Sequence, residues 1–362
     1  MSKDDRLGDI RRRIDAIDAD LLRLLSERAR CAQQVAEVKQ AAGETAFYRP
    51  EREAQVLRRV TADNPGPLPK DAVTHIFREI MSACLALERP LTVAYLGPPG
   101  TFSQDATHKQ FGASVTSLPQ TTIEQVFREV DAGAADYGVV PIENSTEGAV
   151  THTLDMFATS TLKVCGEVEL AVHQQLLSRA ELSAITVVYS HAQSLAQCRR
   201  WLAGHLPGVR TEAVSSNAEA ARRAAGETGA AAIAGESAGR LYDLPRLAAN
   251  IEDEPGNTTR FLVIGKQDTQ PSGRDKTSLL LSTGNRPGAL AALLEPLRRH
   301  GVSMTRIESR PARTGRWQYV FFVDIEGHTQ DAPVQQVLAE LREVATLCKV
   351  LGAYPRASGD AA

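Results

Sequence analysis

The chain has 362 residues, of which 43% are hydrophobic and 23% charged, and its formal net charge at pH 7 is -3. This length exceeds what one hydrophobic core usually serves, so we expect two or three domains. A net charge so close to zero gives no field strong enough to hold nucleic acid. No stretch approaches the ~20 apolar residues of a membrane span, so we expect a cytoplasmic protein that binds neither nucleic acid nor membrane.

The first 90 residues are predicted to be an all-α domain. From Leu7 to Val38, apolar residues recur at alternating steps of three and four, which is the spacing of a heptad seam. A helix over about 5–41 would be ~55 Å long, too long to bury its apolar stripe within one small domain, so we expect a homodimer through this helix. Two further helices are expected, from about Pro50 and from Asp71 to about Glu88.

Two cations lie on the apolar face of the first predicted helix. Arg28 occupies a seam position where an apolar residue is expected, and Lys39 lies about three turns further on the same face. A polar residue in a seam can set the register of a helix pair. The two cations could equally belong to structural ion pairs or to an anion-binding site, and the residues alone leave these alternatives open.

After Pro90, short apolar strands alternate with helical patterns, which predicts an α/β domain with largely parallel sheets over residues 91–267. Three strands end in polar motifs, namely GPPGTFSQ (97–104), PIENSTEGAV (141–150) and YSHAQS (189–194). Ligands of α/β proteins bind at such strand ends, although helix capping alone explains many hydroxyls there. The candidate lining residues are Thr101, Ser103, Asn144, Ser145, Ser190, His191 and Gln193.

Residues 275–355 are predicted to form a third, α+β domain. The polar segment QDTQPSGRDK (267–276) is typical of a linker, and the order βαββαβ that follows is ferredoxin-like. NRPGAL (285–290) places Pro287 in the first turn of a helix, whose N–H groups could hold a carboxylate.

These motifs together resemble the bifunctional chorismate mutase/prephenate dehydratase family with a C-terminal ACT domain. RRRIDAIDADLLRLLSERARCAQQVAEVK with FYRPEREAQVL resembles the helical mutase, while GTFS, PIENS and NTTRF in combination resemble the dehydratase. NRPGAL with IESRP (307–311) resembles the phenylalanine-regulated ACT domain. The resemblance implies conversion of chorismate to prephenate and of prephenate to phenylpyruvate, with inhibition by L-phenylalanine. Truncation after Gly265 is then expected to leave an active enzyme that phenylalanine no longer inhibits. It also implies a two-lobed dehydratase like the periplasmic binding proteins, and dimer contacts through the ACT domains.

The resemblance further assigns residues to each site. The implied mutase residues are Arg11, Arg28, Lys39, Arg52 and Glu53, with Glu88 where many relatives have Gln and Cys84 where Ser is frequent. Arg11 precedes Arg28 by 17 positions, or ~25 Å along a helix, so Arg11 is expected to serve the partner's site. In the dehydratase, Thr259 is implied as the donor to the departing hydroxyl, with Arg260 beside it. The implied regulatory residues are Asn285, Gly288, Ala289, Leu290, Glu308, Ser309, Arg310 and Pro311.

No metal or cofactor is expected. The five cysteines lack CxxC or metal-ligand spacing, which predicts thiols that form neither a disulfide framework nor a zinc site. Two other functions compete with the one implied, a non-catalytic amino-acid sensor and a mutase fused to prephenate dehydrogenase. The inward cations argue against the sensor, and the lack of a GxGxxG unit argues against NAD binding.

Overall fold

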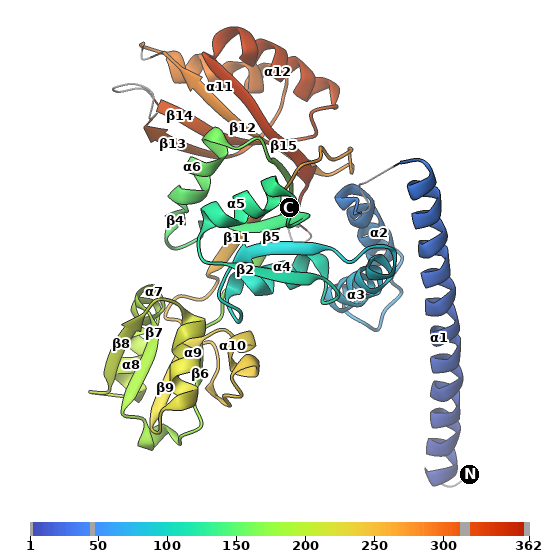
Figure 1. Ribbon diagram of the computed structural model, residues 1–362, viewed down its shortest axis with the longest axis vertical. Coiled ribbons are helices and arrows are strands. Elements are labelled where there is room, and N and C mark those ends of the chain that lie inside the picture. The colour runs from blue at the N-terminus through green and yellow to red at the C-terminus, as the bar shows by residue number, and fades with distance from the viewer. Residues whose placement is uncertain (1–2, 44–47, 285, 312–318, 358–362) are drawn as a thin grey trace. The chain divides into compact units, whose positions relative to one another are not determined.

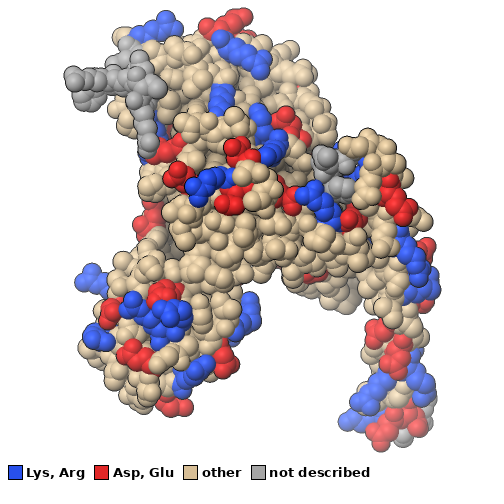
Figure 2. Space-filling model, in the orientation of Figure 1, with Lys and Arg blue, Asp and Glu red and all other residues tan. Residues whose placement is uncertain are grey.

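The computed structural model describes residues 3–43, 48–284, 286–311 and 319–357 (Figure 1). The chain divides into two compact units, one made of residues 1–49, 56–91 and 111–116 and the other of residues 50–55, 92–110 and 117–362. In the part of the chain that the structure describes, no helix combines the length and apolar content of a membrane span. On the face shown in Figure 2, Lys and Arg side chains are interspersed with Asp and Glu.

The three helices predicted at the N-terminus are present. They are α1 (Lys3–Ala41), α2 (Pro50–Ala62) and α3 (Lys70–Glu88). Acidic residues in the first turn of α1 and Lys39 in its last turn complement the helix dipole. Helix α1 packs on α3 near its C-terminal end, where Ala36 is buried. The apolar seam of α1 is otherwise largely exposed, at Leu7, Ile10, Ile14, Ile17, Leu21, Leu24, Val35 and Val38.

The second unit begins with a lobe built on a mixed sheet of order β2-β1-β3-β11-β5, with β4 paired to β3. Helices α4, α5 and α6 accompany it, and Thr122 caps the strongly amphipathic α5 by accepting from the Gln125 N–H. The elements are β1 (Thr92–Leu96), α4 (Phe102–Phe111), β2 (Thr116–Gln120), α5 (Ile123–Ala132), β3 (Tyr137–Asn144), β4 (Gly148–Ala149), α6 (Thr151–Thr159), β5 (Lys163–Ala171) and β11 (Thr258–Gly265).

A second lobe lies between β5 and β11 in the chain. Its sheet has the order β10-β6-β9-β7-β8, and small alanine side chains let α9 pack closely on β9. The elements are β6 (Gln175–Leu177), β7 (Val187–His191), α7 (Ala192–Gln197), α8 (Arg199–His205), β8 (Arg210–Val214), α9 (Asn217–Gly226), β9 (Ala230–Ala234), α10 (Glu236–Leu241) and β10 (Arg246–Ala248).

The prediction of largely parallel sheets was wrong. Strand β1 is parallel to β3, but β11 is antiparallel to both β3 and β5. In the second lobe, β7 is parallel to β8 and β9, whereas β6 is antiparallel to β9 and β10. The reason is topological, because the chain leaves the first lobe along β5 and returns along β11 in the opposite direction.

The C-terminal domain has the predicted βαββαβ order, with an antiparallel sheet β13-β14-β12-β15. One local prediction was wrong, because Pro287 precedes the helix instead of occupying its first turn. Gly288 is the N-cap residue and has φ of 78°, which ends the preceding turn and starts the helix at Ala289. The elements are β12 (Asp275–Thr283), α11 (Ala289–Arg299), β13 (Met304–Pro311), β14 (Tyr319–Glu326), α12 (Ala332–Val344) and β15 (Leu347–Pro355).

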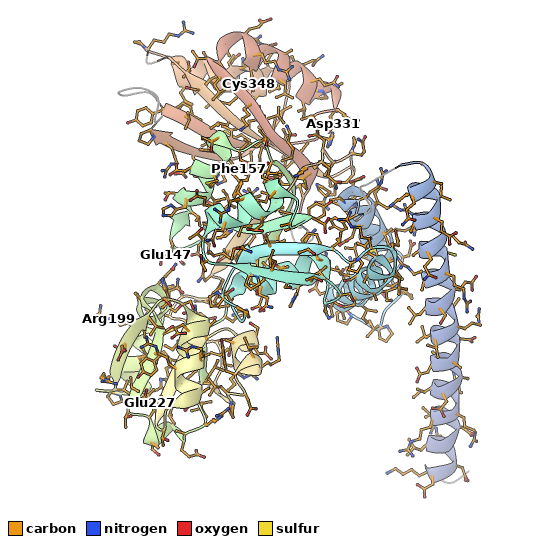
Figure 3. The ribbon with its side chains drawn as sticks, in the orientation of Figure 1. Glu147, Phe157, Arg199, Glu227, Asp331 and Cys348 are labelled. Atoms are coloured by element: carbon orange, nitrogen blue, oxygen red, sulfur yellow. The ribbon has the colours of Figure 1, made fainter. Side chains whose placement is uncertain are left out.

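The first lobe and the C-terminal domain share one hydrophobic core. Leu280, Phe322 and Leu351 belong to the same buried cluster as Phe157 of α6, which Figure 3 labels between the two. The backbones come so close that a side chain at Gly352 would meet the Val164 carbonyl. The predicted linker is correspondingly not an exposed tether, because Thr269, Ser272, Asp275 and Lys276 are buried.

Candidate active sites

The first candidate site gathers residues of α1 and α3. The Glu88 carboxyl lies close enough to Lys39 and Arg28 that both charges lower its pKa, yet burial has the larger effect and raises that pKa overall. One carboxyl oxygen, Glu88 Oε2, is buried without a hydrogen-bond partner in the described structure. Cys84 lies one turn earlier on α3 and is also buried. The structure therefore brings together four of the predicted mutase residues.

The other predicted mutase residues are Arg11, Arg52 and Glu53. Arg11 is exposed near the start of α1, far from Arg28 on the same helix, as its position in the sequence requires. Arg52 and Glu53 lie in the first turn of α2, where Arg52 is exposed and Glu53 half-buried. Helix α1 therefore does not place Arg11 beside Arg28 of the same protomer.

The second candidate site is centred on a pair of residues on adjacent strands. Asn144 at the end of β3 pairs in register with Thr259 of β11, and Asn144 Nδ2 donates to Thr259 Oγ1 at 2.8 Å. The same amide donates to Asn257 Oδ1 at 2.7 Å and accepts from the backbone N–H groups of Thr146 and Glu147. An amide held on both sides in this way has a fixed orientation. Because Thr259 Oγ1 already accepts from Asn144, its hydroxyl proton can be directed to a ligand.

A chain of polar contacts extends from this pair into the second lobe. Asn257 donates to Gln197 Oε1 at 3.4 Å, and Gln174 contacts both Gln197 and Ser194. Asn217 donates to Ser194 Oγ at 2.9 Å and accepts from the Ser190 hydroxyl and the His191 N–H. One chain of contacts therefore links the polar motif that ends β3 in the first lobe with the motif that ends β7 in the second.

The predicted lining residues serve this region in different ways. Ser145 is exposed and accepts from the Thr258 N–H, whereas Ser190 is fully buried and donates to the Ile233 carbonyl. The Thr101 hydroxyl lies within hydrogen-bonding distance of the Leu96 and Pro98 carbonyls, so it stabilises its own turn. The remaining three are Ser103, which is buried in α4, His191, whose side chain caps α7, and Gln193, which is half-buried in α7.

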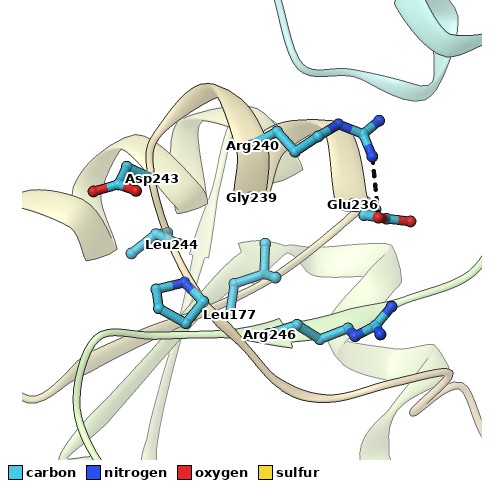
Figure 4. Close-up of a pocket in the computed structure, with 8 residues that line it drawn as sticks. Leu177, Glu236, Gly239, Arg240, Asp243, Leu244 and Arg246 are labelled. Atoms are coloured by element: carbon cyan, nitrogen blue, oxygen red, sulfur yellow. Dashed lines mark ion pairs between the residues drawn. The ribbon is translucent and has the colours of Figure 1, made fainter. Parts of the chain in front are cut away.

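Two of the cavities that the described residues line lie in or beside the second lobe. One, of about 430 Å³, is lined by Thr146, Gln197 and Asn257 together with Arg200 and the carboxylates of residues 252–254. It adjoins the polar chain, and Glu147 in Figure 3 marks the turn beside it. The other, of about 460 Å³, lies in the second lobe between α10 and β10, where Arg240 pairs with Glu236 (Figure 4). It shares no lining residue with the polar chain, so we assign it no part in the site.

The prediction that Arg260 binds substrate beside Thr259 is at odds with the structure. Successive residues of a strand point to opposite faces, and the Arg260 side chain points away from Asn144. Its guanidinium binds Glu167 at 2.8 Å, Asp324 at 2.6 Å and the Tyr354 hydroxyl at 3.0 Å. These partners raise the pKa of Arg260 well above its usual value, against the opposing and largest single effect of burial.

The predicted regulatory residues lie at one end of the C-terminal sheet. Thr283, which precedes the NRPGAL loop, and Pro311 both pair with Tyr319 of β14. Ala289 is buried, Leu290 and Ser309 are exposed, and Glu308 is half-buried. Arg310 forms an ion pair with Asp155 of α6 at 2.9 Å. Asn285 lies outside the described residues.

Sequence reasoning missed several members of the polar chain. Asn257 and Ser194 stand inside motifs that had been singled out, and Gln197 lies one helical turn after Gln193. Those three could have been found from strand register and helical spacing. Gln174 and Asn217 stand in no recognisable motif, since only the fold of the second lobe brings them to the cleft.

Comparison with known proteins finds matches along nearly the whole chain. Family models match residues 10–89 (chorismate mutase type II), 93–269 (prephenate dehydratase) and 277–343 (ACT domain). The bifunctional chorismate mutase/prephenate dehydratase of Stutzerimonas stutzeri is 56% identical over 99% of this chain and 100% of its own length. The solved prephenate dehydratase from Arthrobacter aurescens, in complex with L-Phe, has a TM-score of 0.68 and 36% identity, covering 74% of this chain and 90% of its own. GqqA, described as a novel type of quorum-quenching acylase, has the same TM-score at 30% identity, covering 74% of this chain and 98% of its own.

A helical domain with inward cations, a two-lobed domain with a polar cleft and a ferredoxin-like module define a multidomain enzyme with two active sites. The full-length similarity makes the assignment specific. The chain belongs to the family of bifunctional chorismate mutase/prephenate dehydratases, and it has both activities together with an ACT domain.

Proposed function

We propose that the two reactions use the residues described above, with a mutase domain over 1–90, a dehydratase domain over 91–267 and an ACT domain over 275–355. The observation that carries the dehydratase assignment is the 2.8 Å hydrogen bond from Asn144 to Thr259, which fixes a hydroxyl donor at the cleft. L-phenylalanine is the proposed regulatory ligand.

In the dehydratase step, prephenate loses carbon dioxide and its ring hydroxyl while the ring becomes aromatic. The electrons of the breaking carbon–carboxylate bond enter the ring, and the C–O bond breaks as hydroxide departs. Thr259 donates a hydrogen bond to the departing oxygen, where negative charge develops. A threonine hydroxyl is too weak an acid to give up its proton outright, so Thr259 positions and stabilises the leaving group.

The test is Thr259→Ala with Thr259→Ser as its matched control. Removing the hydroxyl should abolish phenylpyruvate formation, followed by absorbance, while prephenate formation from chorismate stays near the wild-type rate. The serine variant keeps the donor and should retain most dehydratase activity. Equal loss of both activities in Thr259→Ala would contradict two separate sites.

The mutase step needs no acid, base or nucleophile, because the rearrangement requires a compact substrate conformer and stabilisation of charge on the ether oxygen. Arginines hold the two carboxylates of chorismate bidentately and so bring the reacting ends together. Lys39 donates to the ether oxygen, Glu88 lies opposite it, and Glu53 binds the substrate hydroxyl. Arg11 comes from the partner protomer.

The dimer is supported by the exposed seam of α1. Eight large apolar side chains of this seam are at least 45% exposed, which exceeds what an isolated soluble helix normally presents to water. A second copy of the helix can bury this stripe and deliver Arg11 to the opposite site. The ACT domains are proposed to add a second contact between protomers.

L-phenylalanine is proposed to bind near Gly288, Ala289 and residues 308–311 and to close the dehydratase cleft by favouring one ACT pairing. The convergence of both segments at one end of the sheet supports this location. Titration with L-phenylalanine should lower the dehydratase rate in the full chain. Gly288→Val, which cannot adopt φ of 78° without strain, should weaken that inhibition.

A further inference from the structure

The two strands that carry the dehydratase residues have a second functional face. Thr259 pairs in register with Asn144, and the next pair along the same strands is Arg260 with Glu143. Because side chains alternate, Glu143 and Arg260 point away from the cleft when Asn144 and Thr259 point into it. That opposite face is covered by the ACT domain.

Both back-facing residues bind ACT side chains. Glu143 Oε2 accepts from Arg306 Nε of β13 at 2.8 Å, and the Arg306 side chain is 10% exposed. Arg260 contacts Asp324 of β14 and the Tyr354 hydroxyl of β15. Each cleft residue is thus the immediate chain neighbour of a residue anchored in the regulatory sheet.

The Arg260 side is a closed and buried network. Glu167 of β5, which is fully buried, binds Arg260 and also Lys276 Nζ at 2.9 Å. Ser278 lies between Asp324 and Tyr354 and contacts both. Removing one member of a buried ion network destabilises the fold strongly. This network therefore provides a rigid anchor for β11.

The Glu143–Arg306 pair is different, because the Glu143 side chain is 39% exposed and Arg306 has a second carboxylate, that of Glu308, at 4.0 Å. When the pair breaks, the Glu143 carboxylate can turn to solvent and the Arg306 guanidinium keeps Glu308 as a partner. Arg306 lies one residue before the IESRP segment, so a rearrangement of β13 would move it directly.

We propose that Glu143 and Arg260 are positioning residues, through which the ACT domain holds Asn144 and Thr259 in their productive geometry. Arg260 anchors β11, and the Glu143–Arg306 pair is the adjustable contact. Its loss lets the end of β3 shift and lengthens the hydrogen bond from Asn144 to Thr259. The idea that phenylalanine acts through this pair rests on the proposed regulation. The positioning role of the pair does not depend on that regulation.

The experiment uses full-length enzyme without phenylalanine. Arg306→Gln and Glu143→Gln should each lower the dehydratase kcat by roughly tenfold with little change in the KM for prephenate, as expected when a contact only positions the donor. The double variant should be no slower than either single variant, because the two changes break one contact. Arg306→Lys should recover part of the rate. Mutase kcat/KM should stay at the wild-type value, which also reports that the chain is folded.

The matched control is Lys349→Gln. Lys349 is an ACT side chain that donates to the Phe157 and Ser160 carbonyls of the first lobe, so it crosses the same boundary without touching a neighbour of Asn144 or Thr259. It should keep the wild-type dehydratase kcat. An equal loss in Lys349→Gln, additive losses in the double variant, or a change in KM alone would overturn the proposal.

Adding phenylalanine afterwards separates the two hypotheses. If wild-type enzyme is inhibited, Arg306→Gln should show a several-fold weaker response, because the contact that the effector adjusts is already lost. If wild-type enzyme is not inhibited, the proposed regulation fails while the kcat result still decides the positioning role. Full inhibition of Arg306→Gln would overturn the part of the proposal that concerns regulation.

Discussion

Glu88 combines a raised pKa with a place between two cations. Burial raises the pKa of its carboxyl more than Lys39 and Arg28 lower it, so the group stays protonated to higher pH than an exposed glutamate. A protonated carboxyl can donate to the ether oxygen of chorismate, whereas an ionised one repels the charge that develops there. The competent form of the proposed mutase site is therefore the protonated one.

We predict that mutase kcat/KM falls as pH rises through this raised pKa, and that Glu88→Gln flattens this limb because an amide donates at any pH. The measurement compares both proteins with chorismate from roughly pH 5 to 9, a range that brackets a raised carboxyl pKa. Superimposable profiles would show that Glu88 does not face the substrate.

A second prediction concerns Asn144→Asp. The carboxylate keeps the acceptor for the Thr146 and Glu147 N–H groups but loses the donor to Thr259, and it would draw the Thr259 proton away from the leaving group. Dehydratase kcat should fall by on the order of 10²-fold, the loss typical of a misdirected oxyanion donor. Mutase activity of the same preparation is the internal control. Unchanged dehydratase kcat would separate Asn144 from the chemistry.

At the residue scale, the sequence predicted which motifs lie near the proposed cleft more reliably than it predicted where each side chain points. Thr259 and Arg260 are adjacent in NTTRF, but the period of a strand sends them to opposite faces. Ser190 belongs to a motif at the cleft, yet its hydroxyl donates its hydrogen bond to a backbone carbonyl. Contacts such as that of Asn217 depend on tertiary structure and leave no local pattern.

At the scale of elements, α1 decides how the mutase site is assembled. Its 39 residues keep Arg11 and Arg28 a fixed and large distance apart, so neither can replace the other within one protomer. The heptad pattern alone predicted the helix, because periodicity over ten turns outweighs local propensity.

Co-expression of Arg11→Ala and Arg28→Ala chains tests the sharing of sites. Each variant alone should lack mutase activity, while mixed dimers carry one intact site and one doubly altered site. Random pairing should then restore about a quarter of the wild-type mutase activity, since about half the dimers are mixed and half of their sites are intact. Dehydratase activity normalises the amounts of protein. No recovery would mean that each site takes Arg11 and Arg28 from the same protomer.

Other elements show where patterns fail. The ferredoxin-like order was predictable from alternating strand and helix signals, whereas the strands β4, β6 and β10 are too short to give one. The mixed sheets follow from the crossing between lobes, which local sequence does not report. Polar composition suggested a linker at 267–276, but tertiary packing buries much of it.

At the scale of the whole molecule, the shared core determines how truncation affects stability. Removing residues after Gly265 would expose the first-lobe part of a cluster that includes Leu280, Phe322 and Leu351. We therefore predict that the truncated chain aggregates or melts far below the full-length enzyme, instead of forming the active dehydratase that the family resemblance implied. Soluble truncated enzyme with normal thermal stability would contradict this.

A smaller change to the same shared core is Leu351→Ala, which should lower the free energy of unfolding by about 2–5 kcal/mol. Because Leu351 lies in the shared core, loss of dehydratase activity on heating should shift together with the unfolding of the ACT domain. Val337→Ala, in the core internal to the ACT domain, is the control for general destabilisation of that domain.

The alternation of faces along β11 also bears on how the chain avoids misfolding. A slip of one residue would place the Arg260 guanidinium in the cleft and the Thr259 hydroxyl against Glu167 and Asp324, leaving buried carboxylates without their cation. A misregistered strand thus meets an electrostatic penalty at the very residues whose correct placement makes the enzyme work. The contacts that connect the catalytic strands to the ACT domain therefore also favour the native register of β11 during folding.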